Sequence, residues 1–128
     1  MSEAITRGVK VEVESEYSEE RSNPDGGVYF FVYHVVVTNV GEETVRLISR
    51  HWIITNADGK KEEVRGPGVV GEQPTLKPGE SFEYSSFCPL STPFGMMHGT
   101  YQMVTDAGEE FDAQIAPFTL SREEVMYH

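Results

Sequence analysis

The sequence predicts an all-β protein that folds as one antiparallel β-sandwich. Roughly seven short segments rich in Val, Ile, Tyr and Phe follow one another, and most of them alternate apolar with polar residues. Residues typical of turns separate these segments at regular intervals, and no long segment carries the apolar spacing of a helix. A chain of 128 residues fits a single domain, with a core that we expect over about residues 9–120 and with flexible termini.

The first half of the chain supplies four of the expected strands. Residues 9–17 place Val and Tyr on one parity and mostly Lys and Glu on the other, as a half-buried strand does. A loop leads to residues 28–39, whose nearly continuous apolar content indicates a strand buried on both faces or bent across the core. Residues 44–66 then predict a long strand, a hairpin turn at Asp58-Gly59 and a short, charged return strand.

The second half predicts three further strands. A Pro-Gly turn leads into a strand at residues 81–87, and a connection of thirteen residues, 87–99, follows it. Strands are then expected at residues 100–105 and 109–120, with a turn between them. The last residues, 121–128, have a briefly helical pattern or form a frayed tail.

Two aromatic residues refine the prediction to an immunoglobulin-like or fibronectin type III-like sandwich. Trp52 lies in the third predicted strand, where such folds bury a tryptophan. Tyr101 begins the penultimate strand, where a tyrosine corner would place its hydroxyl on a backbone group. Cys88 is the one cysteine, so no disulfide bond accompanies Trp52 and we expect aromatic packing to stabilise the core.

The balance of charges excludes several classes of protein. The formal net charge is −11 and the ten Lys and Arg residues are scattered, so we expect no direct binding to nucleic acid. No apolar run approaches the roughly 20 residues of a membrane-spanning helix, and the N-terminus lacks the apolar core of a signal peptide. The lone Cys88 fits a reducing compartment, so we expect a cytoplasmic protein.

Gly66, Gly68 and Gly71 have the spacing Gly-x-Gly-x-x-Gly of phosphate-binding loops. A dinucleotide-binding loop opens a helix, whereas here prolines and a strand follow, and the Lys-Ser or Lys-Thr of a Walker loop is absent. Two interpretations remain open. The glycines are turn or bulge residues, or their N–H groups form an anion-binding nest beside Arg65, although Pro67 supplies no N–H.

Arg50 shares its parity with Trp52, so its guanidinium would point into the face that holds the tryptophan. Either a bulge breaks the alternation, or Arg50 finds a carboxylate, a carbonyl or an anion. The hypothetical anion site, for pyrophosphate or a nucleotide, consists of Arg50, Arg65, Gly66, Gly68 and Gly71.

The connection at residues 87–99 is rich in apolar residues and longer than most hairpin loops. Exposed Phe and Met side chains adapt well to a protein surface, so this segment either binds a partner or folds back to cap the sandwich. The candidate partner-binding residues are Pro89, Leu90, Phe94, Met96 and Met97.

Catalytic and metal-binding patterns are absent from the sequence. No histidine is spaced from another His, Cys or carboxylate as closed zinc sites require. Ser49, His51 and Asp58, or Cys88 with His98, can be assembled on paper, but neither set lies in a motif with a mechanism. We therefore expect no catalytic residues, no metal and no cofactor.

Four blocks of sequence, in order, carry a resemblance to a known family. "SRHWIIT", "VRGPGVVGEQP", "LKPGESFEY" and "CPLSTPFGMMHGTYQM" resemble signature blocks of the ApaG family, also called CorD, and the resemblance spans about residues 9–120. It implies a fibronectin-like sandwich, an association with cobalt tolerance and magnesium efflux, and binding of pyrophosphate-type anions through the glycines. The related domain is fused to F-box proteins and to a DNA-polymerase-interacting protein, which implies a protein-interaction module without catalytic residues.

The sequence and the resemblance together favour a non-catalytic binding or adaptor module in cation homeostasis. The alternative is a protein that binds phosphate, pyrophosphate or a nucleotide. The identity of the partner is open, and so is the oligomeric state, because the edge strands of a sandwich allow dimers.

Overall fold

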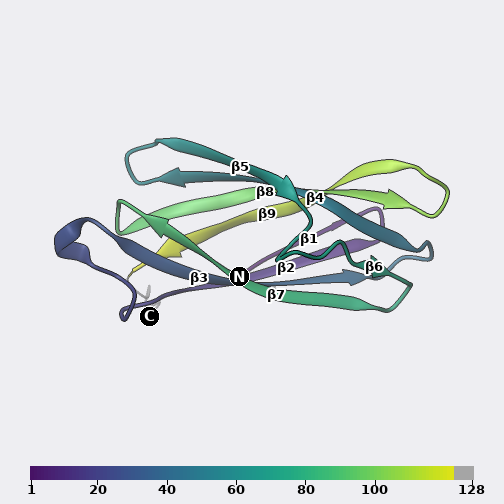
Figure 1. Ribbon diagram of the computed structural model, residues 1–128, viewed down its shortest axis with the longest axis horizontal. Helices are drawn as coiled ribbons and strands as arrows, with labels where there is room; N and C mark the ends of the chain where they lie inside the picture. Colours follow the sequence, from purple (N-terminus) through teal and green to yellow (C-terminus); the bar gives the residue numbers. More distant parts are fainter. Residues whose placement is uncertain (123–128) are drawn as a thin grey trace, which may run out of the picture.

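The protein is a β-sandwich of two antiparallel sheets, as the sequence predicts (Figure 1). The computed structural model describes residues 1–122, so most of the C-terminal segment for which a helix or a frayed tail was expected lies outside the described residues. One sheet has the order β1-β2-β3-β7 and the other β5-β4-β8-β9, with β6 paired to β4. The strands are β1 (Ser2–Thr6), β2 (Val9–Tyr17), β3 (Tyr29–Asn39), β4 (Val45–Asn56), β5 (Lys61–Pro67), β6 (Thr75–Leu76), β7 (Ser81–Leu90), β8 (Phe94–Thr105) and β9 (Glu110–Ser121).

The core forms where the alternating apolar residues of the two sheets meet. Trp52 is 2% exposed and packs edge-on against Tyr33, Phe118 and Tyr101, with ring centroids 5.4, 5.9 and 6.2 Å away. In antibody domains a disulfide bond lies beside this tryptophan. Here aromatic packing stabilises the same part of the core. Tyr101 is fully buried, but its hydroxyl bonds the Tyr84 hydroxyl rather than a backbone group, so the predicted bond of a tyrosine corner is wrong.

β3 differs from the expected strand that is buried on both faces or bent. Its odd-numbered residues from Phe31 to Asn39 are buried, whereas the even-numbered ones are half-buried on the outer face. The strand lies between β2 and β7 along most of its length, and neighbouring side chains shield its outer apolar residues only in part. The outer face of this sheet therefore carries more apolar side chains than a strand with strict alternation of apolar and polar residues would place there.

The predicted connection at residues 87–99 is wrong, because most of it belongs to the strands β7 and β8, which lie in different sheets and do not pair with each other. We call this crossing from one sheet to the other the β7–β8 arch. β7 continues to Leu90 and β8 begins at Phe94, so only residues 91–93 join them. Pro89 is tolerated because β7 is an edge strand, where a missing N–H breaks no ladder on the free side. Position 99 inside β8 requires a glycine, because a Cβ there would lie 2.0 Å from the His51 carbonyl oxygen.

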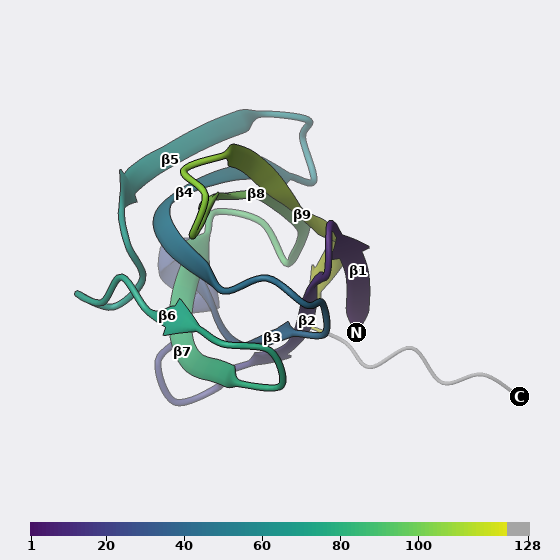
Figure 2. The ribbon, with the colours of Figure 1, turned by 90° about the vertical axis from the view of Figure 1, so that its right-hand side faces the viewer.

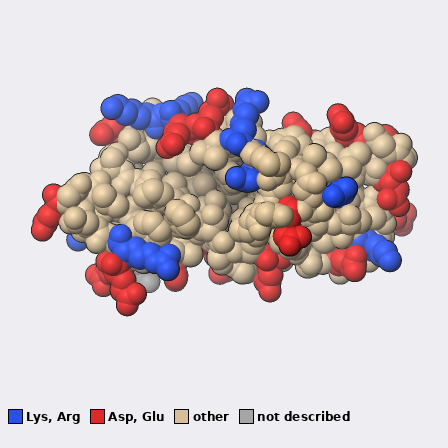
Figure 3. Space-filling view, in the orientation of Figure 1, with Lys and Arg blue, Asp and Glu red and all other residues tan. Residues whose placement is uncertain are grey.

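The two sides of the sandwich differ (Figure 2). On one side β1, which the sequence analysis did not predict, pairs with β2 and packs against β9. On the other side lie the edges of β5 and β7, and the segment from β5 to β6 passes between them. Lys and Arg stand on the face of Figure 3 in separate groups among acidic side chains, with no continuous positive patch. No helix within residues 1–122 is long and apolar enough to cross a membrane.

Candidate functional site

The glycine segment after β5 is a closed turn. Gly68 and Gly71 have φ of +57° and +81°, and a Cβ on Gly68 would lie 2.2 Å from the Glu72 carbonyl oxygen. The Gly68 N–H donates to the Ile48 carbonyl and the Val69 N–H to the Glu72 carbonyl, each at 2.8 Å. These N–H groups are therefore engaged within the fold, and the positive φ angles support the turn interpretation.

Arg50 finds its partners in the carbonyl groups of this turn. Its Nη1 donates to the carbonyl oxygens of Pro67 and Gly68, each at 2.9 Å. A Cβ on Gly66 would lie 2.8 Å from Arg50 Nη2, so the absence of a side chain makes room for the guanidinium. Of the alternatives that the sequence left open, the carbonyl is the observed one, and a β-bulge also occurs nearby, between Leu47 and Ser49.

Arg50, Arg65 and Gly66 line one shallow hollow on the sheet of β4, whereas Gly68 and Gly71 do not. The hollow has a volume of about 650 Å³, and Arg65 lies opposite His51 in the ladder of β4 and β5. Polar side chains complete its lining and were not grouped at one site from the sequence, although alternation on β4, β8 and β9 could have grouped all of them except Gln73. They are Ser49, His51, Gln73, Thr100, Gln102 and Asp112.

Ser49 and His51, which the sequence allowed as parts of a catalytic triad with Asp58, are hydrogen-bonded to other side chains. The Ser49 hydroxyl donates to Gln102 Oε1 at 2.8 Å, and His51 Nε2 lies 3.2 Å from Glu63 Oε1. Ser49 and His51 thus bond to different partners and not to each other. Burial raises the pKa of the Cys88 thiol to about 11, so this group is protonated and unreactive at neutral pH.

The five candidate partner residues divide between the core and the surface. Met97 is 1% exposed and Leu90 is buried, so these two side chains help to fill the sandwich. Phe94 and Met96 are 53% and 45% exposed and share the outer face of β8, while Pro89 is exposed on the edge strand β7. The alternation of β8, which a loop would not have, decides which residues point outward.

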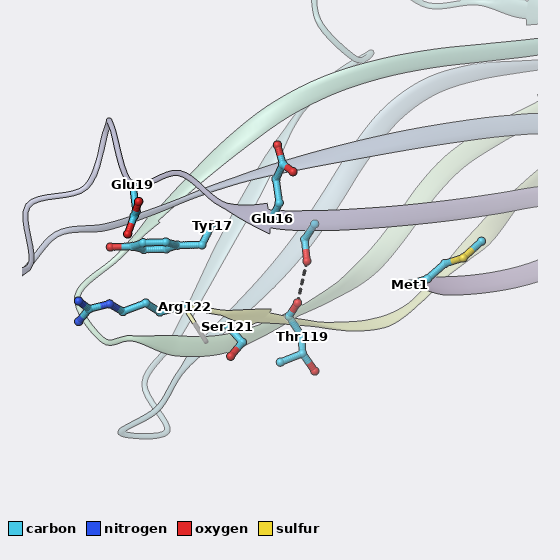
Figure 4. A pocket seen from close by; sticks show the side chains of 8 residues that line it. Met1, Glu16, Tyr17, Glu19, Thr119, Ser121 and Arg122 are labelled. Carbon is cyan, nitrogen blue, oxygen red and sulfur yellow. Dashed lines mark hydrogen bonds between the residues drawn. The ribbon is translucent and has the colours of Figure 1, made fainter. Parts of the chain in front are cut away.

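A further groove, of about 570 Å³, lies between β2 and β9 (Figure 4). The Ser15 hydroxyl donates to the Thr119 carbonyl at 2.8 Å and spans the groove. The Arg122 guanidinium lies 6.0 Å from the ring centre of Tyr17, at the end of the groove opposite Met1. The sequence did not predict this groove, because β2 and β9 are far apart in the chain.

Comparison with known proteins identifies the family. Residues 19–105 match the ApaG domain model. The chain belongs to the ApaG family. It is 55% identical over 124 residues to protein ApaG of Rhodopseudomonas palustris (strain TIE-1), with 97% of this chain and 95% of that protein covered. It is 58% identical over 120 residues to protein ApaG of Anaeromyxobacter dehalogenans (strain 2CP-C), with 94% of each covered.

Solved structures of similar sequence have the same fold. The crystal structure of an ApaA protein from Bordetella pertussis superposes with a TM-score of 0.89 at 48% identity, covering 91% of this chain and 95% of that one. The resemblance read from the four sequence blocks is therefore confirmed, and so is the sandwich.

Proposed function

We propose that the protein is a non-catalytic binding or adaptor module that binds a protein partner through the β7–β8 arch, at the start of β8. The observation that carries this proposal is the exposure of Phe94 and Met96, 53% and 45%, on one face of β8. Ile53 of β4, which is half-buried and faces the same side, pairs with His98, the next residue after Met96 on this face of β8. Exposed aromatic and Met side chains of this kind contribute much of the binding energy at protein interfaces.

The protonated Cys88 thiol and the absence of a catalytic motif from the sequence support a role without chemistry. The cobalt tolerance and magnesium efflux that the family resemblance implies would then follow from action on another protein. A cytoplasmic location, expected from the single cysteine, belongs to the same proposal.

Affinity capture of the tagged protein from its own cells tests the proposed role of the β7–β8 arch. The variant Phe94→Ala/Met96→Ala is expected to lose a partner that the unmodified protein retains, because it removes the exposed side chains alone. Met97 is left intact, since its truncation would open a cavity in the core. Ile5→Ala/Val40→Ala, which truncates two exposed apolar residues elsewhere, is the matched control.

All three proteins should melt within about 2 °C of one another, because surface substitutions change stability little. Retention of the partner by Phe94→Ala/Met96→Ala, or its equal loss from the control, would contradict the proposal.

The alternative function, binding of a phosphate-type anion, is supported by the hollow that contains Arg50, Arg65 and Gly66. Within the described residues Arg65 forms no ion pair and its side chain is exposed. Thr100 adds a hydroxyl donor to the same surface, whereas the Ser49 hydroxyl and the Gln102 amide already donate to Gln102 Oε1 and Thr100 Oγ1. An anion there would be bound by side chains, since the N–H groups of Gly68 and Val69 are already engaged.

Amide NMR titration with pyrophosphate tests this alternative. Arg65→Ala is the informative variant, because Arg50 holds the carbonyls of the turn and its loss would also disturb the fold. We expect saturable shifts near Arg65 and a binding constant at least ~10-fold weaker in Arg65→Ala, with Lys61→Ala on the same strand as the control of equal charge. Flat spectra at millimolar pyrophosphate would exclude the anion site.

A further inference from the structure

The outer face of β2, β3 and β7 combines apolar side chains with carboxylates and lies on the other sheet from Phe94 and Met96. Two rows of the ladder run across it, Glu14–His34–Ser85 and Glu16–Val32–Phe87. We call these six residues the acidic face.

Aromatic rings form the apolar end of the acidic face. Phe87 is 59% exposed and its ring stacks on that of Phe30, with centroids 5.2 Å apart. Val32 and Val36 continue the apolar strip along β3 and are only half-buried. An exposed apolar strip of this kind on the surface of a sheet is typical of an interaction site.

Two shallow hollows make the face concave. One, of about 400 Å³, is lined among others by Glu20, Arg21 and Phe87, and the other, of about 250 Å³, by Glu14, Glu16 and His34. Val32 and Ser85 line both hollows, so the two adjoin across the middle of the face. An extended or helical segment can therefore lie along the face and reach the rings and the carboxylates together.

The charges on this face are mostly negative and mostly unpaired. Within the described residues, Glu14, Glu16 and Glu20 form no ion pair, while Glu83 meets His34 at 3.2 Å. The Glu16 side chain leaves β2 on the side opposite Thr119, toward the outer face (Figure 4). Carboxylates beside an apolar strip are complementary to Lys and Arg beside Leu or Phe.

The face already holds one cation on an aromatic ring. The Arg21 guanidinium lies 5.6 Å from the centre of the Phe30 ring. This contact shows that the aromatic pair accepts a guanidinium, as a partner's Arg would require. Lys10, on β2 of this sheet, is engaged by Glu3 and Glu12 at 3.8 and 3.5 Å.

We propose that the acidic face binds a basic, amphipathic segment of another protein, with apolar side chains on Val32 and Phe87 and with Lys or Arg against Glu14 and Glu16. A second copy of this chain is a poorer occupant, because two such faces would bring like charges together and the whole chain carries −11. An anionic membrane or a nucleic acid is repelled for the same reason.

The probe for the test is a fluorescein-labelled synthetic peptide of Leu and Lys, spaced for an amphipathic helix, and its matched peptide with Glu in place of Lys. Fluorescence anisotropy at physiological salt should give saturable binding of the Lys peptide and none of the Glu peptide. Failure of the Lys peptide to bind, or equal binding of both, would overturn the proposal.

Variants locate the binding. Glu14→Lys/Glu16→Lys should weaken binding at least ~10-fold, whereas Asp106→Lys/Glu110→Lys, an equal change of net charge away from the acidic face, should stay within ~2-fold. Equal weakening by both pairs would mean attraction by net charge alone and would overturn the proposal.

Two phenylalanine variants separate this proposal from the proposed interface at the β7–β8 arch. Phe87→Ser should also lose at least ~10-fold in affinity, while Phe94→Ser, a similarly exposed Phe on the other sheet, should not. The reverse order would overturn the acidic face and favour the β7–β8 arch, so the two proposals fail separately. Thermal unfolding of each variant confirms that the sandwich is intact.

Discussion

At the scale of single residues, one arginine holds the glycine segment against the sheet. Arg50 reaches the carbonyls of Pro67 and Gly68 through the space that Gly66 leaves beside its own backbone. Gly66 has no positive φ, so its role is to provide space rather than an unusual backbone conformation. Gly68 needs both, because its φ is +57° and the Glu72 carbonyl lies against it.

Gly66→Ala should therefore destabilise the protein by about 1–2 kcal/mol, because the guanidinium must move and weaken its two hydrogen bonds. In an Arg50→Ala background the same change should cost about 1 kcal/mol less, since the obstructing group is gone. Urea denaturation of the four proteins of this cycle measures the coupling. Additive effects would show that Gly66 and Arg50 act independently.

The hydroxyl pair in the core gives a second prediction. Tyr101→Phe leaves the buried Tyr84 hydroxyl without its partner, which should cost about 1–3 kcal/mol. Replacing both tyrosines with Phe should be less destabilising than the sum of the single changes, because no unpaired hydroxyl is left behind. The free energies of unfolding of the three variants test this prediction. A double variant whose loss of stability equals the sum of the two single losses would contradict the role of the pair.

At the scale of elements, the β7–β8 arch joins the two sheets, and the residues of its two strands alternate between core and surface. Its glycines lie where strands approach closely, and Gly99 packs on the His51 carbonyl beside the irregular pairing of β8 with β9. A segment with such glycines and prolines looks like a loop in the sequence. In the structure the segment belongs to strands, because its glycines lie where a neighbouring strand leaves no room for a side chain.

Met97→Ala and Met96→Ala test this alternation. Met97 is buried at the core and its truncation should cost about 2–5 kcal/mol, while the exposed Met96 should cost less than about 1 kcal/mol. Thermal unfolding of the two variants measures the difference. Similar losses at both positions would mean that residues 94–99 do not alternate as a strand.

At the scale of the whole molecule, the core buries groups that ionise at alkaline pH. Burial raises the pKa of Cys88 from 9.0 to about 11, and it also raises the pKa of Tyr33, Tyr84 and Tyr101 above 10.0. As the pH rises, these groups lose their protons at a lower pH in the unfolded chain than in the native protein. Since the unfolded state then binds fewer protons than the native state, stability must fall as the pH rises.

We expect the free energy of unfolding to be insensitive to these groups below about pH 8 and to decline from about pH 9 upward. Urea denaturation at pH 8 and at pH 10 measures the decline. Cys88→Ala should reduce its first part, because the thiol is the first of these groups to ionise in the unfolded chain. A free energy that rises over this interval would contradict the burial of these groups.

The sequence by itself determined the sandwich, the family and most of the strands. Alternation and turn residues are local signals, so the segments that became β2, β3, β4, β5 and β9 could be found one at a time. Trp52 was expected in the core from its place in the third strand of an immunoglobulin-like sandwich, and it is 2% exposed. The four sequence blocks carried the family, which the ApaG domain model confirms.

Only the tertiary structure decided which candidate site residues come together. Arg50 donates to carbonyl groups of the glycine turn. Gly68 and Gly71 lie outside the hollow that Arg65 lines, and the side chains of Leu90 and Met97 are buried in the core. These outcomes depend on bulges, edge positions and strand partners far away in the chain, such as the pairing of Gly99 with Trp52. Periodicity along one segment says which residues share a face, but the neighbouring strands decide what that face meets.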